Sequence, residues 1–83
     1  MPEIEVGKVI HYFGKVAVAA VKLTGELAVG DNIKIKTRSG EFTQNIESMQ
    51  IDKTSVQKAG AGSDIGIKVA EHVKEGDTVF KVI

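Results

Sequence analysis

The 83-residue sequence has no cysteine, no tryptophan and one proline, and aromatic residues make up only 5% of it. Without cysteine there is no disulfide framework and no thiol chemistry, which fits a reducing compartment. No apolar run approaches the roughly 18 residues of a membrane helix. The opening residues 1–8, MPEIEVGK, are too acidic and too polar for a secretory signal peptide. We therefore expect a cytoplasmic protein that does not engage a membrane.

A net charge is also missing, because lysine plus arginine and aspartate plus glutamate both total 11. Strong non-specific binding to nucleic acids normally needs a basic excess that neutralises several phosphates. Any contact with RNA would therefore be local, or else the partner is a protein. The 42% of hydrophobic and 27% of charged residues are typical of a globular fold, and the length suits a single domain over residues 1–83.

Helix signals are weak, because β-branched residues are frequent and nine glycines are scattered along the chain. Short apolar runs bounded by Gly, Asp, Asn and Ser predict strands instead. The expected strands are 3–12, 16–23, 32–37, 42–51, 55–58, 65–69 and 78–82. Slips in the alternation predict a bulge near Gly7 and a bend near Ser48. We expect an all-β fold, a small closed antiparallel barrel of about six to seven strands, which leaves no free sheet edge.

One pattern occurs twice: an apolar residue, two further residues, Gly-Asp, one residue and another apolar residue, starting at Leu27 and at Val73. Glycine closes a turn at positive φ without penalty, and aspartate can bond a backbone N–H two residues further on. No acid–base partner of recognised spacing stands beside either aspartate. We therefore interpret both copies as structural turns rather than as catalytic sites. Their turn residues are Gly30, Asp31, Gly76 and Asp77.

Two other features are weak candidates for chemistry. The glycine-rich stretch Gly60–Gly66, with Gly62 as its turn residue, is followed by a predicted strand, whereas phosphate and dinucleotide loops open a helix. The two histidines, His11 and His72, lie far apart, and no spacing of histidine, cysteine or carboxylates indicates a metal site. We expect no metal, no cofactor and no catalytic residue.

A basic group is the best candidate contact surface. Lys34, Lys36 and Arg38 alternate along one predicted strand into its hairpin, and Lys22 is expected on a neighbouring strand. Such a group can hold a phosphate backbone. Solvated lysines on the open face of a strand are the more common explanation.

The few aromatic residues divide into two pairs. Phe42 and Phe80 are expected in the core. Tyr12 and Phe13 stand at a predicted turn, where they either pack the hairpin or contact a base or a protein partner.

The segment 46–69, IESMQIDKTSVQKAGAGSDIGIKV, resembles the second domain of translational GTPases, the small β-barrel of elongation factor Tu and of initiation factors. The matching positions are Ile46, Ser48, Met49, Val56, Ala59, Ala61, Gly62, Gly66 and Ile67. Upstream, GKVAVAAVKLTGELAVGDNIKI resembles the opening of the same barrel. The closing VKEGDTVFKV is similar to the end of the related C-terminal barrel of collagenase-like peptidase family proteins, and to stand-alone elongation-factor-like proteins.

The resemblance implies a non-enzymatic binding module, because neither a GTPase domain with its P-loop nor a peptidase-like catalytic portion is present. Its implied partner is RNA (tRNA or rRNA), a ribonucleoprotein, or a protein of the translation and RNA-modification machinery. The alternative is a protein-interaction accessory barrel for a larger enzyme such as a collagenase-like peptidase. In that case Val16 and Val18, or Ala17 and Ala19, of the two-sided apolar strand would be covered by the partner.

Overall fold

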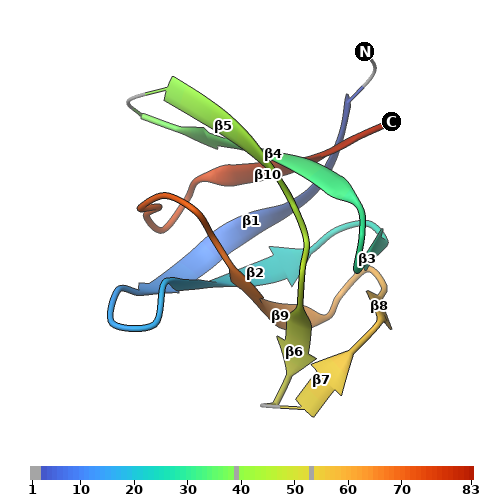
Figure 1. Ribbon diagram of the computed structural model, residues 1–83. Coiled ribbons are helices and arrows are strands. Elements are labelled where there is room, and N and C mark those ends of the chain that lie inside the picture. Colours follow the sequence, from blue (N-terminus) through green and yellow to red (C-terminus); the bar gives the residue numbers. More distant parts are fainter. Residues whose placement is uncertain (1–2, 39, 53) are drawn as a thin grey trace.

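The computed structural model describes residues 3–38, 40–52 and 54–83, and these form ten strands and no helix (Figure 1). The all-β prediction is therefore confirmed, and no helix of the described residues is available to cross a membrane. The strands are β1 (Glu3–Phe13), β2 (Val18–Leu23), β3 (Leu27–Ala28), β4 (Asn32–Thr37), β5 (Gly40–Asn45), β6 (Met49–Ile51), β7 (Thr54–Val56), β8 (Lys58–Ala59), β9 (Asp64–Lys68) and β10 (Thr78–Val82). The expectations for the first two residues, and for Ser39 in the β4–β5 hairpin, lie outside the described part.

All strand pairs are antiparallel, in one curved eight-stranded sheet of order β5-β4-β10-β1-β2-β9-β6-β7 and a separate β3–β8 pair. Glu3 lies opposite Val82, so the first and last strands are neighbours and the described ends of the chain lie at one side of the molecule (Figure 1). Within the described residues no ladder joins β5 to β7. The ring of hydrogen bonds expected for a closed barrel is therefore not confirmed.

One side chain links the sheet edge at β5 to the end of β9. The Gln44 Nε2 donates to the Lys68 carbonyl at 2.7 Å, and the Ala70 N–H donates to the Gln44 Oε1 at 2.7 Å. The amide of Gln44 thus offers a donor and an acceptor in the way a backbone peptide group does. This fork connects two parts of the sheet that no strand pairing joins.

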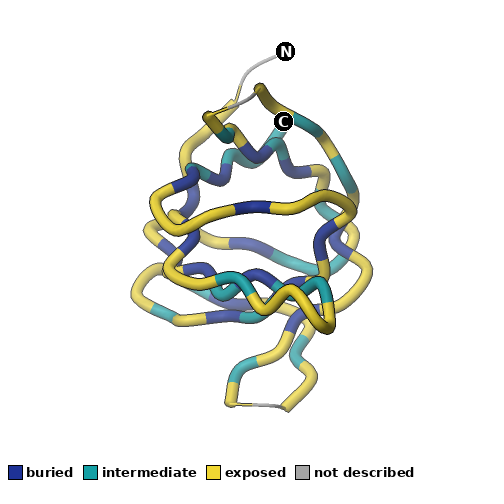
Figure 2. Tube along the Cα trace, turned by 90° about the vertical axis from the view of Figure 1, so that its left-hand side faces the viewer, coloured by how far each residue is buried: buried dark blue, intermediate teal, exposed yellow. Residues whose placement is uncertain are grey.

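Two predicted strands end differently from expectation. The strand expected over 42–51 is divided into β5 and β6 by an irregular stretch at 46–48, where the bend was predicted. The strand expected from Val16 begins at Val18, because Ala17 has a φ of 55° inside the preceding turn. The ten observed strands outnumber the predicted six to seven for three reasons. The strand expected over 42–51 is divided, β7 and β8 stand where one strand was expected over 55–58, and the two-residue β3 was not predicted. The β6–β7 hairpin extends away from the rest of the fold (Figures 1 and 2).

The predicted irregularity at Gly7 is present as a shift of register between Glu5 and Gly7 against β10. A Cβ built on Gly7 would lie 2.8 Å from the Lys22 carbonyl oxygen and 2.8 Å from Val21 Cγ1. Real Cβ atoms do not approach backbone oxygens so closely. Gly7 is therefore required for the close contact between β1 and β2.

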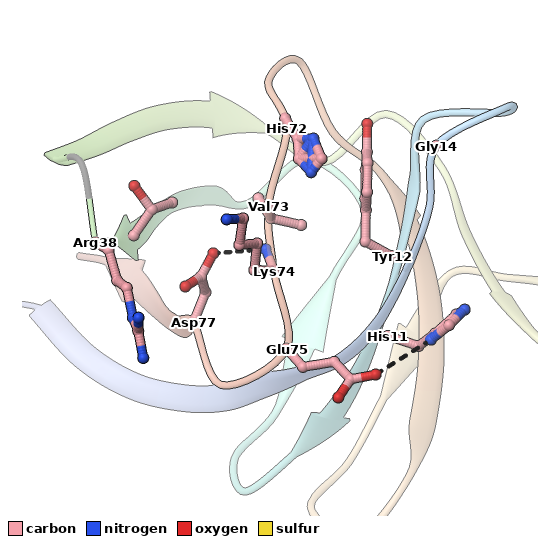
Figure 3. A pocket seen from close by; sticks show the side chains of 10 residues that line it. His11, Tyr12, Gly14, Arg38, His72, Val73, Lys74, Glu75 and Asp77 are labelled. Atoms are coloured by element: carbon pink, nitrogen blue, oxygen red, sulfur yellow. Dashed lines mark hydrogen bonds and ion pairs between the residues drawn. The ribbon is translucent and has the colours of Figure 1, made fainter.

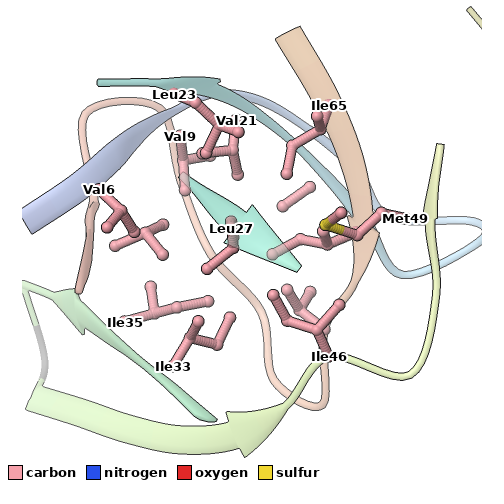
Figure 4. Close-up of a cluster of buried hydrophobic side chains, with 14 of the residues drawn as sticks. Val6, Val9, Val21, Leu23, Leu27, Ile33, Ile35, Ile46, Met49 and Ile65 are labelled. Carbon is pink, nitrogen blue, oxygen red and sulfur yellow. The ribbon is translucent and has the colours of Figure 1, made fainter. Parts of the chain in front are cut away.

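The core lies on the inner face of the curved sheet and contains aliphatic residues and one methionine (Figure 4). Buried and exposed residues alternate along the strands, as a sheet with one covered face requires (Figure 2). Phe42 packs on the edge of this core. The expectation for Phe80 is wrong: it alternates with the fully buried Val79 and lies on the outer face, where the Lys36 ammonium is 5.6 Å from its ring centre. The buried residues are Val6, Val9, Ala19, Val21, Leu23, Leu27, Ile33, Ile35, Ile46, Met49, Ala59, Ile65, Ile67, Val69, Val73 and Val79.

Substitution of Gly7 tests the close approach of β1 and β2. We expect Gly7→Ala to lower the free energy of unfolding by about 1–3 kcal/mol, because the added methyl group overpacks the contact with Lys22 and Val21. Gly60→Ala is the matched control, since nothing lies within 4 Å of its added Cβ. Urea unfolding measures both variants, and equal stability of the two would contradict the requirement for glycine.

Candidate functional site

The first Gly-Asp turn joins β3 to β4. Gly30 has a φ of 96°, and the Asp31 N–H donates to the Ala28 carbonyl at 3.1 Å. The Asp31 carboxylate accepts the Ala28 N–H at 2.9 Å, which lies three residues before it rather than two residues after it as predicted. The turn is also bonded to the buried Ile46, whose carbonyl accepts the Gly30 N–H at 2.8 Å and whose N–H donates to the Asp31 carbonyl at 2.9 Å.

The second Gly-Asp turn, before β10, repeats this set of bonds. Gly76 has a φ of 92°, the Asp77 N–H donates to the Lys74 carbonyl at 3.1 Å, and the Asp77 carboxylate accepts the Lys74 N–H at 2.8 Å. Val9 takes the place of Ile46: its carbonyl accepts the Gly76 N–H and its N–H donates to the Asp77 carbonyl, both at 2.8 Å. Both aspartates thus bond backbone groups of their own turns. The third positive-φ turn glycine of the prediction, Gly62, has a φ of 91°.

The two turns differ in their ion pairs. The Asp31 carboxylate is 3.3 Å from the Lys81 Nζ, and both residues line a small cleft of about 360 Å³ beside the first turn. Asp77 is only 8% exposed, and no lysine or arginine of the described residues forms an ion pair with it. The aspartate of the first turn therefore has an ion pair with a lysine, whereas the aspartate of the second turn has none with the described residues.

A larger open cleft, of about 1000 Å³, lies beside the second turn (Figure 3). Three separate segments build it: the end of β1 with its following turn, the start of the β4–β5 hairpin, and the loop 69–77 before β10. Its lining residues are His11, Tyr12, Gly14, Thr37, Arg38, His72, Val73, Lys74, Glu75 and Asp77. We call this space the histidine cleft, because it contains both histidines of the chain.

Side chains of the histidine cleft interact in pairs. The His11 Nδ1 is 3.4 Å from the Glu75 Oε1, and the Tyr12 ring lies against the His72 ring with centres 4.5 Å apart. Within the described part of the chain, no three histidine, aspartate or glutamate residues are placed to hold a metal ion. The sequence interpretation missed this cleft, because only the pairing of β1 with β10 brings His11 near a loop that begins almost sixty residues later.

The predicted basic group is dispersed in the structure. Lys34 is only 18% exposed, and its Nζ lies 2.7 Å from Glu3 Oε2 and 3.3 Å from Glu41 Oε1. The hydrogen bond to Glu3 is the main cause that raises the pKa of Lys34 above the ordinary lysine value. Lys34 is therefore neutralised locally and is poorly placed to meet an external anion.

The other three predicted cations lie in two places. Lys36 on β4 and Lys22 on β2 share one row of the outer face, separated by Thr78 and Lys8 on the intervening strands. Arg38 instead lines the histidine cleft. Strand register thus separates Arg38 from the row to which the sequence assigned it.

Apolar side chains that are exposed or half-buried gather at the end of β1, in the turn 14–17 and at the start of β2, where Phe13 and Val18 are paired, and we call this group the apolar face. Val16 is 60% exposed and Phe13 49%, and Val18 is half-buried, whereas Ala19 is fully buried in the core. Ile10 on β1 adds a further exposed side chain. Of the two predicted alternatives, only the pair Val16 and Val18 is available to a partner.

Comparison with known proteins relates the chain to proteases, although no model of a protein family matches it. It is 37% identical over 79 residues to an uncharacterized protease of Methanocaldococcus jannaschii, covering 94% of the chain and 19% of that protease. Two collagenases of Porphyromonas gingivalis are each 36% identical, over 95% and 92% of the chain and 20% and 22% of their own lengths. The chain spans about a fifth of these relatives. It is homologous to one domain-sized part of collagenase-like proteins.

Two solved structures share the fold of this chain. The C-terminal domain of a Geobacillus thermoleovorans protein described as a U32 peptidase superposes with a TM-score of 0.90 over 96% of this chain and 93% of that domain. Its selenomethionine variant gives 0.86 over 90% and 95%, and the identity is 19% in both cases. The collagenase-like half of the predicted resemblance is supported. These relatives are not translation factors, so the other half stays a prediction.

Replacement of Lys34 tests its structural role. We expect Lys34→Gln to lower the melting temperature at neutral pH, because it removes the contacts to Glu3 and Glu41. A pKa raised by folding stabilises the fold below the ordinary lysine value, and this contribution is lost as the pH rises through the raised value. The difference from the unmodified protein should therefore shrink as the pH rises beyond the ordinary lysine value of about 10.4. Thermal unfolding at both pH values measures it, and a difference independent of pH would contradict the ion-pair explanation.

Proposed function

We propose that the chain is a non-catalytic accessory domain that works with a peptidase-type catalytic unit, either within one polypeptide or as an assembled partner. The observation that carries this proposal is the 36–37% identity to about a fifth of a protease and two collagenases. The match in fold to a C-terminal domain of a U32 peptidase supports it. In this role the domain would bind polypeptide or position the catalytic unit, and the cysteine-free composition favours a cytoplasmic setting.

The proposal excludes catalysis by this domain on chemical grounds. The His11–Glu75 pair has the form of an oriented base, but catalysis also needs a nucleophile beside it. Among the described residues, the hydroxyls that line the histidine cleft are those of Tyr12 and Thr37, and the Thr37 hydroxyl donates to the Gly40 carbonyl at 3.1 Å. Among the described residues, the Tyr12 ring packs on His72, and no hydrogen bond joins the Tyr12 hydroxyl to either histidine.

RNA binding, the other function expected from the sequence, has less support. Its predicted contact group is divided, and Lys34 is already paired with two glutamates. The net charge of zero adds no general attraction for phosphates.

The apolar face of Ile10, Phe13, Val16 and Val18 is the surface that we assign to the catalytic unit. Exposed apolar side chains that cluster on one face of a small domain commonly mark a protein interface. Their neighbours across β2 and β9 are the small residues Ala20 and Gly66, which allow the close approach of another protein surface.

A chimera tests the proposed function. The segment of a Porphyromonas gingivalis collagenase that matches this chain is deleted, or is replaced by this chain, and cleavage of denatured collagen is measured. We expect the deletion to lose turnover and the replacement to restore it, while the isolated chain cleaves nothing. Full turnover after the deletion, or turnover by the isolated chain, would contradict the proposal.

Within this chimera, Val16→Asp tests the interface. We expect the substitution to leave the isolated domain as stable as before, because Val16 is exposed, and to weaken domain contact by placing a charge in an apolar interface. Limited proteolysis of the chimera measures the contact, with Thr54→Asp on the distant β6–β7 hairpin as the matched control. Equal protease sensitivity of both variants would remove the apolar face from the interface.

A further inference from the structure

We propose that the histidine cleft binds an extended polypeptide segment through a carboxylate, from an acidic side chain or a free C-terminus. The choice of a polypeptide rests on the proposed function, whereas the choice of a carboxylate rests on the cleft itself. Three segments distant in sequence, including both histidines and Arg38, converge on this one concave space (Figure 3). Convergent polar groups in a cleft are the usual form of a ligand site.

Two cations of the cleft are available to an external anion. Neither Arg38 nor Lys74 forms an ion pair with any described residue, in contrast to Lys34 and Lys81. Arg38 projects from the β4–β5 hairpin and Lys74 from the loop before β10, so they approach the cleft from two different elements (Figure 3). The guanidinium of an arginine binds a carboxylate through two parallel hydrogen bonds.

The two carboxylates of the cleft are already engaged. Glu75 is paired with His11 at 3.4 Å. Asp77 accepts the Lys74 backbone N–H at 2.8 Å and is almost fully buried. A ligand carboxylate bound by Arg38 would lie on a different element from both, because Arg38 is an exposed residue of the β4–β5 hairpin.

The opposite wall of the cleft is a ring surface suited to a peptide. Tyr12 and His72 pack against each other at 4.5 Å, which fixes both rings without burying either of them completely. Fixed rings of this kind give apolar or proline side chains a flat surface at low entropic cost. A peptide that places its carboxylate on Arg38 and Lys74 would cover these rings with its neighbouring residues.

The limited number of cations favours a polypeptide over a nucleic acid. A nucleic-acid strand presents a phosphate at every nucleotide and needs a continuous basic track. The cleft offers two unpaired cations beside two carboxylates, which matches one or two carboxylates of a ligand. The cleft at the first turn suits this ligand less, because its described lining includes no aromatic ring and only one cation outside an ion pair, Lys58, since Lys81 is held by Asp31.

Fluorescence anisotropy of the isolated chain tests the proposal with three labelled probes. These are a twelve-residue proline-rich peptide with two aspartates and a free C-terminus, its amidated form with asparagines, and a twelve-nucleotide oligouridylate. We expect saturable binding of the acidic peptide and at least about tenfold weaker binding of the amidated peptide. Amide chemical shifts of residues 11–14, 38 and 72–75 should change during the titration.

Variants locate the binding to the cleft. Arg38→Gln and Lys74→Gln, singly and together, should each weaken binding of the acidic peptide about tenfold. Lys8→Gln with Lys22→Gln removes the same charge from the outer row and should leave affinity unchanged. Melting temperatures show whether each variant is folded. If a variant is not folded, the changes in amide chemical shift of the unmodified protein test whether the peptide binds in the cleft.

Two results would overturn the inference: an acidic peptide that binds no better than its amidated form, or equal losses in the cleft and outer-row variants. Tighter binding of the oligouridylate through Arg38 and Lys74 would overturn the choice of a polypeptide. The chimera experiment does not depend on these residues, so a failure here leaves the accessory role standing. A failure of the chimera experiment removes the functional reason for a polypeptide but leaves the preference of the cleft for a carboxylate standing.

Discussion

The fold depends on the backbone hydrogen bonds that join two Gly-Asp turns to two buried residues, Val9 on β1 and Ile46 between β5 and β6. At each turn, glycine adopts positive φ, and aspartate bonds back to the turn with its carboxylate. A core residue, Ile46 or Val9, exchanges two backbone bonds with the same turn. Because β4 and β10 start from these turns and pair with each other, the turns fix the central register of the sheet. In an aliphatic core without buried rings, such directional bonds supply the specificity that packing of similar side chains leaves open.

The two Gly-Asp turns have the same hydrogen bonds but different neighbouring side chains, and the candidate site lies beside only the second of them. Lys81 crosses from β10 to neutralise Asp31, so the first turn is complete in itself. No lysine or arginine of the described residues pairs with Asp77 of the second turn, and the space beside it is bordered by His11, Tyr12 and Arg38. Because the two turns have the same set of hydrogen bonds, Asp31 and Asp77 both have a structural role. The two turns differ in what surrounds them: of the two, the described lining beside the second turn is the one that combines two cations outside ion pairs with aromatic rings.

Strand positions were predictable wherever alternation was regular, as at 32–37 and 78–82, which match β4 and β10 at both ends. The bulge at Gly7 was also predictable, because an extra residue in a strand interrupts the alternation of apolar and polar residues at that point in the sequence. The division of 42–51 into two strands was visible only as a bend. Periodicity carries no information on how the sheet turns a corner or which side chain, here Gln44, links its ends.

The candidate site was less predictable for a physical reason. Basic residues at period two predict a shared face, but not whether that face already holds acids from other strands. Lys34 meets Glu3, from the far end of the chain, and Glu41, from the next strand. The histidine cleft depends wholly on which strands pair, because its residues share no local pattern. The alternation of apolar residues therefore predicted the strands. The contacts between charged side chains could not be predicted, because they depend on how strands distant in sequence pair.

The ring packing of Tyr12 on His72 has an optical consequence. The chain has no tryptophan, and Tyr12 is its one tyrosine. All tyrosine emission of the unlabelled protein therefore originates at the wall of the histidine cleft, against an imidazole 4.5 Å away. Light from a single ring reports on that cleft alone, so the protein carries its own spectroscopic probe at the place where a ligand would arrive.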